Sequence, residues 1–292
     1  MATNLDRPDV TAVVVHYETP DLLERCLRAL RASSGVSLES VVVDNASQNF
    51  DAAAVESALP GTTVVRNVSN VGFAAGANVG LRDARGRYLL LLNPDTIVEP
   101  DALATLVQFM DARPDVGCTT ARLVMEDGRL DLACRRSFPT PMRAFYRLSL
   151  LSRLFPRSRR FGQYNLTYLD EHEEAEIDAP CGAFMLVRRE TRDQVGPLDE
   201  TYFMYGEDLD WAFRMKEKGW RIVYNPAATA THLKRAASAK ARARTIRAFY
   251  DAMRVFYGRH YQRAYPRLVS WLIYRAIDAR ERLELTALRL RA

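Results

Sequence analysis

The first feature that could take part in chemistry is an apolar strand that ends on a carboxylate. In the stretch YLLLLNPDT, a run of leucines stops at Asn93, Pro94 and Asp95. The run is too short to span a membrane, which takes about 20 residues, but it fits a strand buried on both faces of a sheet. Pro94 cannot donate a ladder hydrogen bond, so the strand is expected to stop there. Asp95 then either caps the next helix or faces the ligand site that open α/β sheets form at this edge.

A metal site at Asp95 requires a partner. Magnesium and manganese accept carboxylate and imidazole ligands and often bridge to substrate phosphates. His232, at the end of the stretch ATATH, is a candidate second ligand. A structural role for this histidine remains the alternative.

A second pair of carboxylates occurs in the stretch MYGEDLDW. Glu207 and Asp208 stand at an expected helix start, where the helix macrodipole favours negative charge. They could be ordinary capping or first-turn residues. A carboxylate at this place could equally act as general base for an acceptor hydroxyl within hydrogen-bond reach.

The elements that position these residues alternate between strand and helix in the first half of the chain. The segments with strand character are 11–17, 40–45, 62–67 and 88–92. The segments with helix character are 20–33, 51–59, 72–85 and the one entered through EPDALATLVQFMDA. Repeated β-α-β order predicts a parallel sheet with helices on both faces.

Polar residues follow each of the four strands. They are His16 and Tyr17, then Asp44 and Asn45, then Asn67 to Asn70, then Asn93 to Asp95. A turn explains any one group, but four groups at one sheet edge favour a binding crevice. The stretch NVGFAAGANVG would let backbone amides approach a phosphate. It is neither the Rossmann glycine pattern nor a P-loop.

The middle of the chain differs in composition. Residues 135–165 mix arginines with bulky apolar residues, and the pattern predicts an amphipathic helix over about 142–155 followed by Arg157, Arg159 and Arg160. Such a segment suits a membrane interface, or a helix packed on the body with its arginines in water. A strand at 183–189, a helix at 206–219 and two short strands around Pro226 are expected next, and the pattern beyond Lys234 is helical.

Charge is distributed unevenly along the 292 residues. The net charge is +5, yet the part from Lys234 onward holds fifteen Lys and Arg against four acidic residues, so the remainder is acidic. A basic tail of this kind suggests an anionic neighbour, membrane or nucleic acid, or a solvated helical face. The polar start contains no signal-peptide core, and the four scattered cysteines indicate reduced thiols of a cytosolic protein.

Five sequence blocks occur in the order found in one family. They are VVVHYETPDLLERCLRAL, VVVDNAS, NVGFAAGANVGL, LLLLNPDT, and GAFMLVRRE…GPLDETYFMYGEDLDWAFRMKEKGW with THLKRAAS. Over about residues 11–235 the chain resembles family 2 glycosyltransferases of the GT-A fold, in particular their rhamnosyltransferase-like branch. The resemblance implies a Rossmann-like, mostly parallel sheet with helices on both faces. The expected domains are a GT-A domain (1–235) with a basic insertion (135–165), and a basic helical extension (236–292).

The resemblance also implies roles for individual residues. Asp208 matches the catalytic base, with Glu207 and Trp211 shaping the acceptor side, and Asp95 and His232 match the ligands of a magnesium or manganese ion. The residues matched to the nucleotide-sugar pocket are His16, Tyr17, Glu18, Asp44, Asn70, Gly72, Asn78, Asn93, Gly182 and Ala183. Asn93 stands where the fuller metal motif has an acidic residue, which leaves one ligand charge fewer.

The expected reaction is inverting transfer of a sugar from a dTDP- or UDP-linked donor, with rhamnose as first choice. The acceptor would be a glycan or a polyprenyl-diphosphate-linked sugar in bacterial cell-surface polysaccharide synthesis. The enzyme would be cytoplasmic, or peripheral on an anionic inner membrane face, without nucleic acid. The alternatives are a nucleotidyltransferase, for which HYETPDLL lacks the glycine-rich basic loop, and a non-catalytic binding protein on the same fold.

Overall fold

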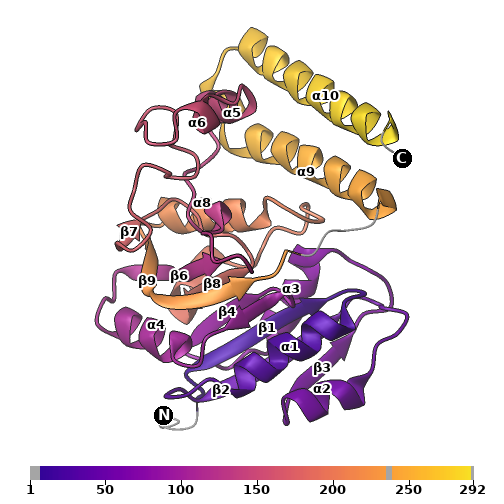
Figure 1. The fold of residues 1–292 in the computed structure, drawn as a ribbon, viewed down its shortest axis with the longest axis vertical. Coiled ribbons are helices and arrows are strands. Elements are labelled where there is room, and N and C mark those ends of the chain that lie inside the picture. The colour runs from indigo at the N-terminus through magenta and orange to yellow at the C-terminus, as the bar shows by residue number, and fades with distance from the viewer. Residues whose placement is uncertain (1–6, 235–238, 291–292) are drawn as a thin grey trace.

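The computed structural model describes residues 7–234 and 239–290, which form a mixed sheet, flanking helices and an outer layer of two long helices (Figure 1). The sheet contains nine strands, with β7 paired to the side of β9. Along the sheet the other strands follow the order β3-β2-β1-β4-β8-β6-β9-β5.

The first four strands are parallel, as the alternation of elements predicts. They are β1 (Val10–His16), β2 (Leu38–Asp44), β3 (Thr63–Arg66) and β4 (Tyr88–Leu92). His16 pairs with Asp44, and Asp44 pairs with Arg66. The carboxyl ends of these strands therefore meet at one edge, where the polar residues were expected to converge.

The second half of the sheet changes direction. Its strands are β5 (Thr96–Val98), β6 (Val116–Val124), β7 (Ala175–Glu176), β8 (Phe184–Arg188) and β9 (Arg221–His232). β8 runs antiparallel to both β4 and β6, β6 and β9 are parallel, and β5 is antiparallel to β9. Sequence analysis missed β5 and β6. Both are bordered by ordinary turn residues, and β6 lacks a strict apolar alternation.

The prediction of two short strands around Pro226 is wrong. One strand, β9, runs through the proline, and its pairing with β6 shifts register between Ala121 and Arg122, which face Asn225 and Thr229. The three residues between Asn225 and Thr229 form a bulge in the pairing. A bulge lets the strand accommodate a proline because the proline needs to donate no ladder hydrogen bond there.

Helices cover the two faces of β1. On α3 (Phe73–Arg82), a Cβ at Gly80 would come within 2.5 Å of Val13, and one at Gly76 within 3.0 Å of Val15. His16 points to the other face, since alternate residues do so, and borders a hollow with residues of α1 (Pro20–Arg31) and α2 (Ala52–Ala58). The small residues of α3 thus serve close helix–sheet packing.

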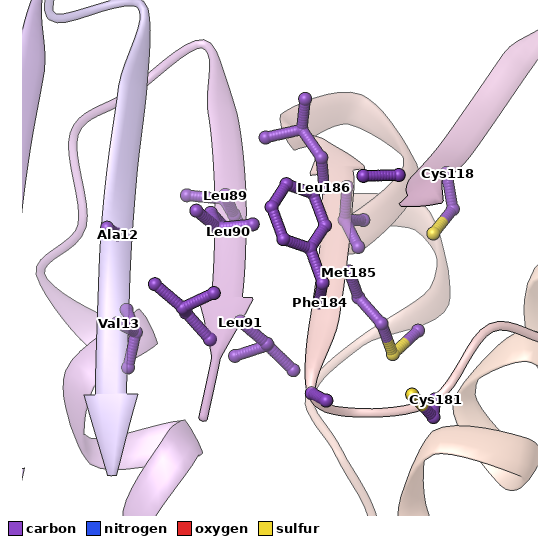
Figure 2. Close-up of a cluster of buried hydrophobic side chains, with 14 of the residues drawn as sticks. Ala12, Val13, Leu89, Leu90, Leu91, Cys118, Cys181, Phe184, Met185 and Leu186 are labelled. Carbon is purple, nitrogen blue, oxygen red and sulfur yellow. The ribbon is translucent and has the colours of Figure 1, made fainter. Parts of the chain in front are cut away.

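The core is continuous across the change in strand direction. Leu89, Leu90 and Leu91 of β4 lie between side chains of β1 and of β8, as Figure 2 shows. All five residues of β4 are buried, as expected for a strand covered on both faces. Burial of one such leucine contributes about 1.5–3 kcal/mol. The cysteines are free thiols in this interior: Cys26, Cys118, Cys134 and Cys181.

Five α-helices lie between β5 and β9 in the chain. They are α4 (Ala102–Asp111), α5 (Pro141–Leu148), α6 (Leu151–Leu154), α7 (Arg189–Val195) and α8 (Glu207–Glu217). The single amphipathic helix expected over 142–155 is two helices. Leu150, between them, has a φ of 63°, a left-handed conformation that interrupts the helix.

Beyond Lys234 the described chain is helical, as expected. α9 (Ala239–His260) packs on α8, where Phe213 and His260 have ring centroids 4.1 Å apart. α10 (Arg267–Leu290) folds back on α9, and Tyr257 bonds to Ser270 at 2.9 Å. α9 therefore lies between α8 and α10 (Figure 1). Within the described ranges, no helix combines the length and apolarity needed to cross a bilayer.

Candidate functional site

Asp95 and His232, the two expected metal ligands, lie together at the sheet edge. β5 pairs with β9 so that Thr96 faces His232, and the backbone N–H of Leu233 donates to the Asp95 carbonyl at 2.9 Å. The His232 Nε2 atom is 3.3 Å from Asp95 Oδ1. Strand pairing thus joins residues that are far apart in the sequence.

Asp131 completes this cluster, and sequence analysis missed it. It precedes a short 3-10 turn (Leu132–Cys134), is 2% exposed, and places Oδ2 at 2.8 Å from His232 Nδ1. Its Oδ1 accepts a hydrogen bond from Lys234 Nζ at 2.6 Å. The stretch DGRLDLAC identifies only an acidic residue beside a turn. Only the fold shows that the carboxylate faces the histidine.

The electrostatics of the cluster favour charge on both partners. Burial opposes the charged form of His232, but hydrogen bonds to Asp131 and Asp95 outweigh it and raise the His232 pKa to about 9. Burial alone would raise the pKa of Asp131. Hydrogen bonds from His232 and Lys234 reverse this and hold the pKa well below the usual range.

The donor set fits one divalent cation, which would replace the proton between His232 Nε2 and Asp95 because a ligating histidine is neutral. A histidine that ligates a metal usually gives its other ring N–H to a carboxylate, and Asp131 occupies that place on His232. The remaining nitrogen then faces Asp95. No cluster of three His, Cys, Asp or Glu side chains with metal-binding geometry occurs in the described parts of the chain. Oxygen atoms of a bound phosphate or of water would have to complete the coordination.

The second carboxylate centre lies at the start of α8. Asp208 Oδ2 accepts hydrogen bonds from Arg136 Nη2 at 2.7 Å and from the backbone N–H of Gly182 at 2.9 Å. Asp208 Oδ1 accepts one from the N–H of Leu209 at 2.7 Å. The carboxylate is held in one orientation, and Asp208 is in direct contact with Gly182.

Glu207 differs from its neighbour in having one carboxylate oxygen without a partner among the described residues. It is 5% exposed, and its Oε2 has no hydrogen-bond partner among the described residues. Burial, reinforced by the negative charge of Asp208, raises the pKa of Glu207. The two residues before it, Tyr205 and Gly206, both have positive φ, 69° and 83°. This backbone turns the start of α8 so that both acidic side chains point inward.

Arg136 is the second residue that sequence analysis missed. It is 9% exposed and donates to the Pro180 carbonyl as well as to Asp208. Its neighbour Arg135 is 2% exposed and donates to the carbonyls of Asp170 and Leu169. The basic insertion expected over 135–165 therefore begins with two buried arginines. Carbonyl or carboxylate oxygens accept hydrogen bonds from the terminal nitrogens of each guanidinium, whereas each Nε is buried without a partner among the described residues.

A backbone contact joins the two centres. The N–H of Asn93, at the end of β4, donates to the Ala183 carbonyl at 3.2 Å, and the Asn93 carbonyl accepts from Thr96 at 3.1 Å. Asn93 thus lies between the strand end that precedes Asp95 and the segment that contacts Asp208. Asn93, Gly182 and Ala183 all lie at this junction.

The residues expected at the nucleotide base form an internal network. His16 is fully buried, and its Nε2 accepts from the Thr19 N–H at 3.1 Å, so the proton is on Nδ1, 2.9 Å from Asp44 Oδ1. Asp44 also accepts from the N–H of Ser47 at 3.1 Å and from Arg66 at 3.2 Å. His16 supports Asp44 from the interior rather than presenting its ring at the surface.

Tyr17 and Glu18 occupy the accessible part of this side. Tyr17 is 44% exposed. Glu18 has a φ of 54°, donates its N–H to Ser47 Oγ and accepts from the Gln48 N–H, both at 2.9 Å. The loops after β1 and β2 are therefore tied together, and the Tyr17 side chain remains exposed beside them.

Asn70 and Gly72 form the turn into α3. Asn70 Oδ1 accepts from the Gly72 N–H at 3.0 Å, and Gly72 has a φ of 90°. A Cβ at Gly72 would come within 2.4 Å of the Phe203 carbonyl, which accepts a hydrogen bond from Phe73 N–H at 2.7 Å. This glycine thus brings the donor-side loop against the segment that leads into α8.

Two expected site residues, Asn78 and Trp211, are directed elsewhere. The Asn78 amide donates to the Leu198 carbonyl and accepts from the Leu198 N–H, both at 2.9 Å. Trp211 is fully buried and donates its indole N–H to the Gly196 carbonyl at 2.9 Å. Both side chains anchor the segment around 196–200 and so position α8 and α3.

Comparison with known proteins assigns the family. The sequence profile described as "Glycosyltransferase like family 2" matches residues 8–251, most of the chain. The chain belongs to glycosyltransferase family 2. The matched range contains Asp95, His232, Glu207 and Asp208 together with the strands and helices that position them.

Relatives of this glycosyltransferase include rhamnosyltransferases. An N-acetylglucosaminyl-diphospho-decaprenol L-rhamnosyltransferase of Mycobacterium tuberculosis is 25% identical over 94% of this chain and 92% of its own length. The rhamnosyltransferase WbbL of Escherichia coli is 29% identical over 52% of this chain and 54% of the relative.

A solved structure shares the fold. The mannosyltransferase PcManGT of Pyrobaculum calidifontis, in complex with GDP-Man and Mn²⁺, is 18% identical and aligns with a TM-score of 0.60. The alignment covers 97% of this chain and 74% of that one. The expected GT-A glycosyltransferase fold with a C-terminal helical part is therefore confirmed.

Proposed function

We propose that this glycosyltransferase moves a sugar from a nucleoside-diphosphate donor to a hydroxyl group of a lipid-linked glycan. Rhamnose from a dTDP-linked donor is the first choice, and UDP-linked hexoses are the alternative. The observation that carries the proposal is the pair of adjoining centres. Asp95 and His232 are 3.3 Å apart on one side, and Asp208 is bonded to Gly182 on the other. The main-chain bond from Asn93 to Ala183 joins them.

On the donor side, the chain's own residues bind and orient the nucleotide sugar. Asp44 is fully buried, so it would shape the pocket for the pyrimidine base through its bonds to Ser47 and Arg66. The exposed Tyr17 would cover the base, and the 70–72 turn would lie along the diphosphate. A magnesium or manganese ion held by Asp95 and His232 would neutralise the diphosphate as it leaves the sugar. Asp131 would keep the His232 ring in the orientation that directs Nε2 toward Asp95.

On the acceptor side, Asp208 is the proposed general base. It would accept the proton of the acceptor hydroxyl as that oxygen attacks the anomeric carbon from the face opposite the leaving diphosphate. One displacement of this kind inverts the anomeric configuration. Arg136 and the Gly182 N–H hold the base in place. Glu207, buried beside it without a partner for Oε2, would shape the acceptor side.

The proposed acceptor is a sugar on a polyprenyl diphosphate, used in cell-surface polysaccharide synthesis. Support comes from the Mycobacterium tuberculosis relative, whose name places its acceptor on diphospho-decaprenol. An enzyme with such an acceptor would work in the cytoplasm at the inner face of the cell membrane.

Nucleotide-dependent thermal stabilisation tests the donor site. The purified protein is melted with dTDP, UDP, GDP or NAD, each with and without manganese. A ligand that binds only the folded state raises the apparent stability. One pyrimidine diphosphate with manganese should raise Tm above the value for either component alone. Absence of a shift with every nucleotide would overturn the proposal.

A further inference from the structure

The outermost helix, α10, carries apolar side chains on the side that faces away from the protein. The side toward α9 is defined by Ser270 and Ile277, which are 5% and 6% exposed. The outward side holds large exposed apolar residues at helical spacing: Leu268, Trp271, Leu272, Leu283 and Leu290. We refer to these five residues as the outer stripe. A helix that only packs on α9 would have no physical reason to present such a stripe to water.

Basic residues accompany the outer stripe, and acidic ones do not. Arg275, Arg282 and Arg289 are exposed and follow one another at intervals of two helical turns. Acidic residues of α10 face inward, where Asp278 pairs with Arg254 of α9 at 2.8 Å and Glu281 pairs with the same arginine. The outward side of α10 is therefore apolar and positively charged.

A second exposed apolar group lies at the same end of the molecule. The α5–α6 segment presents Met142, Phe145, Leu148, Leu150, Leu154 and Phe155. Phe213 of α8 contacts both Phe138, just before α5, and Tyr261, at the turn between α9 and α10, with ring centroids 5.0 and 6.2 Å apart. In Figure 1, α5 and α6 lie beside this turn. The exposed arginines that follow α6 are Arg157, Arg159 and Arg160.

We propose that the outer stripe of α10, together with the exposed residues of α5–α6, docks the enzyme on an anionic membrane surface. A helix with an apolar side and flanking arginines lies in the plane of the interface, with its leucines and tryptophan among the acyl chains and its arginines at anionic headgroups. The 24 residues of α10 give a contact about 36 Å long. A second copy of the chain fits less well, because it would bring two rows of arginines together.

This proposal states where in the cell the enzyme would act. It rests on the proposed function in one respect, which is that the acceptor is lipid-linked. α9 packs between α10 and α8, and α8 begins with Glu207 and Asp208. Docking through α10 would hold the acceptor side of the site near the layer in which a polyprenyl chain is embedded.

Vesicle co-sedimentation tests the surface directly. The full-length protein is mixed with phosphatidylcholine vesicles that contain or lack phosphatidylglycerol, at low and at high salt. Binding is expected with the anionic vesicles and should weaken as salt screens the arginines. The double variant Leu272→Ser/Leu283→Ser should bind them about tenfold to a hundredfold more weakly. Arg275→Glu/Arg282→Glu should lose the preference for anionic lipid.

Val68→Ser is the matched control, since Val68 is fully exposed on the loop after β3, away from α10. Its vesicle binding should equal that of the wild type. Equal binding by Leu272→Ser/Leu283→Ser and wild type would overturn the proposal, as would a dimer in vesicle-free buffer that the same double variant dissociates. Nucleotide-dependent Tm shifts, measured on each variant, report the donor site separately from docking.

Discussion

The buried carboxylates on the two sides of the site differ in their hydrogen-bond partners. On the donor side, Asp44 is fully buried, and hydrogen bonds from His16, Ser47 and Arg66 satisfy its carboxylate. On the acceptor side, Glu207 is almost as deeply buried, yet its Oε2 has no partner in the part of the chain that the structure describes. Asp208 beside it is bonded to a guanidinium and to backbone N–H groups.

This difference sets Glu207 apart from both Asp44 and Asp208, whose carboxylates are held by hydrogen bonds. A buried carboxylate with its oxygens engaged stabilises a loop arrangement, whereas a buried group left unpaired costs free energy that selection for structure alone would remove. Backbone with positive φ occurs on both sides, at Glu18 after β1 and at Tyr205 before α8. The unpaired Oε2 of Glu207 is therefore the feature that distinguishes the start of α8 as a candidate reaction site.

Removing the proposed base should have the largest effect. Asp208→Asn keeps the shape of the side chain but no longer accepts a proton, so turnover should fall about 10²- to 10⁴-fold. Donor affinity, followed through the nucleotide-dependent Tm shift, should stay within a factor of a few. Asp210→Asn on the same helix is a poor comparison because Asp210 is fully buried and bonded to Arg214 and His260. Exposed Asp193 supplies the control as Asp193→Asn. Undiminished turnover in the Asp208 variant would assign the base elsewhere.

Loss of the Asp131–His232 contact should have the second-largest effect. Asp131→Ala removes the carboxylate that orients the His232 ring, so manganese affinity in the presence of nucleoside diphosphate should fall about 10- to 100-fold. Isothermal titration with manganese measures this. Asp127→Ala is the matched control, because Asp127 lies on the surface turn and pairs only with Arg129 in the described structure. If both variants bind manganese as the wild type does, His232 is not held for a metal.

A substitution in the turn into α3 should lower the free energy of unfolding. Gly72→Ala introduces a Cβ 2.4 Å from the Phe203 carbonyl at a φ of 90°, and positive φ alone costs about 1–3 kcal/mol. Gly61→Ala isolates that backbone cost, since Gly61 has a φ of 79° and nothing within 4 Å of its Cβ position. Urea unfolding should show a larger loss for Gly72→Ala. Equal losses would mean that the Gly72–Phe203 approach does not hold the two sides together.

The smallest effect concerns Glu207 and depends on pH. Burial raises its pKa in the folded state, so the folded protein keeps this proton while the unfolded chain loses it above about pH 4.3. Folding stability from this group is then full at low pH and declines as pH rises. Glu207→Gln cannot titrate, so its Tm relative to wild type should climb by a few degrees between about pH 5 and pH 8. A Tm difference independent of pH would contradict the raised pKa.

Much of the first half of the fold followed from local pattern. Four strands and their helices were predicted in the right order, because buried parallel strands and amphipathic helices leave strong periodic signals. β5, β6 and the continuous β9 were not, since their identity depends on pairing with distant segments. The same distinction applies to the two helices at 141–154, where a single left-handed residue, Leu150, breaks a smooth amphipathic pattern.

For the site, the sequence alone determined which acidic and imidazole groups stand at strand and helix ends: Asp44, Asp95, Asp208 and His232. Only the tertiary structure decided what each one meets. Asp131 and Arg136 look like a turn residue and a member of a basic run, yet one orients His232 and the other holds Asp208. Hydrogen bonding across 72 to 101 residues of chain leaves no local pattern, because the partners become neighbours only when the sheet and α8 have assembled.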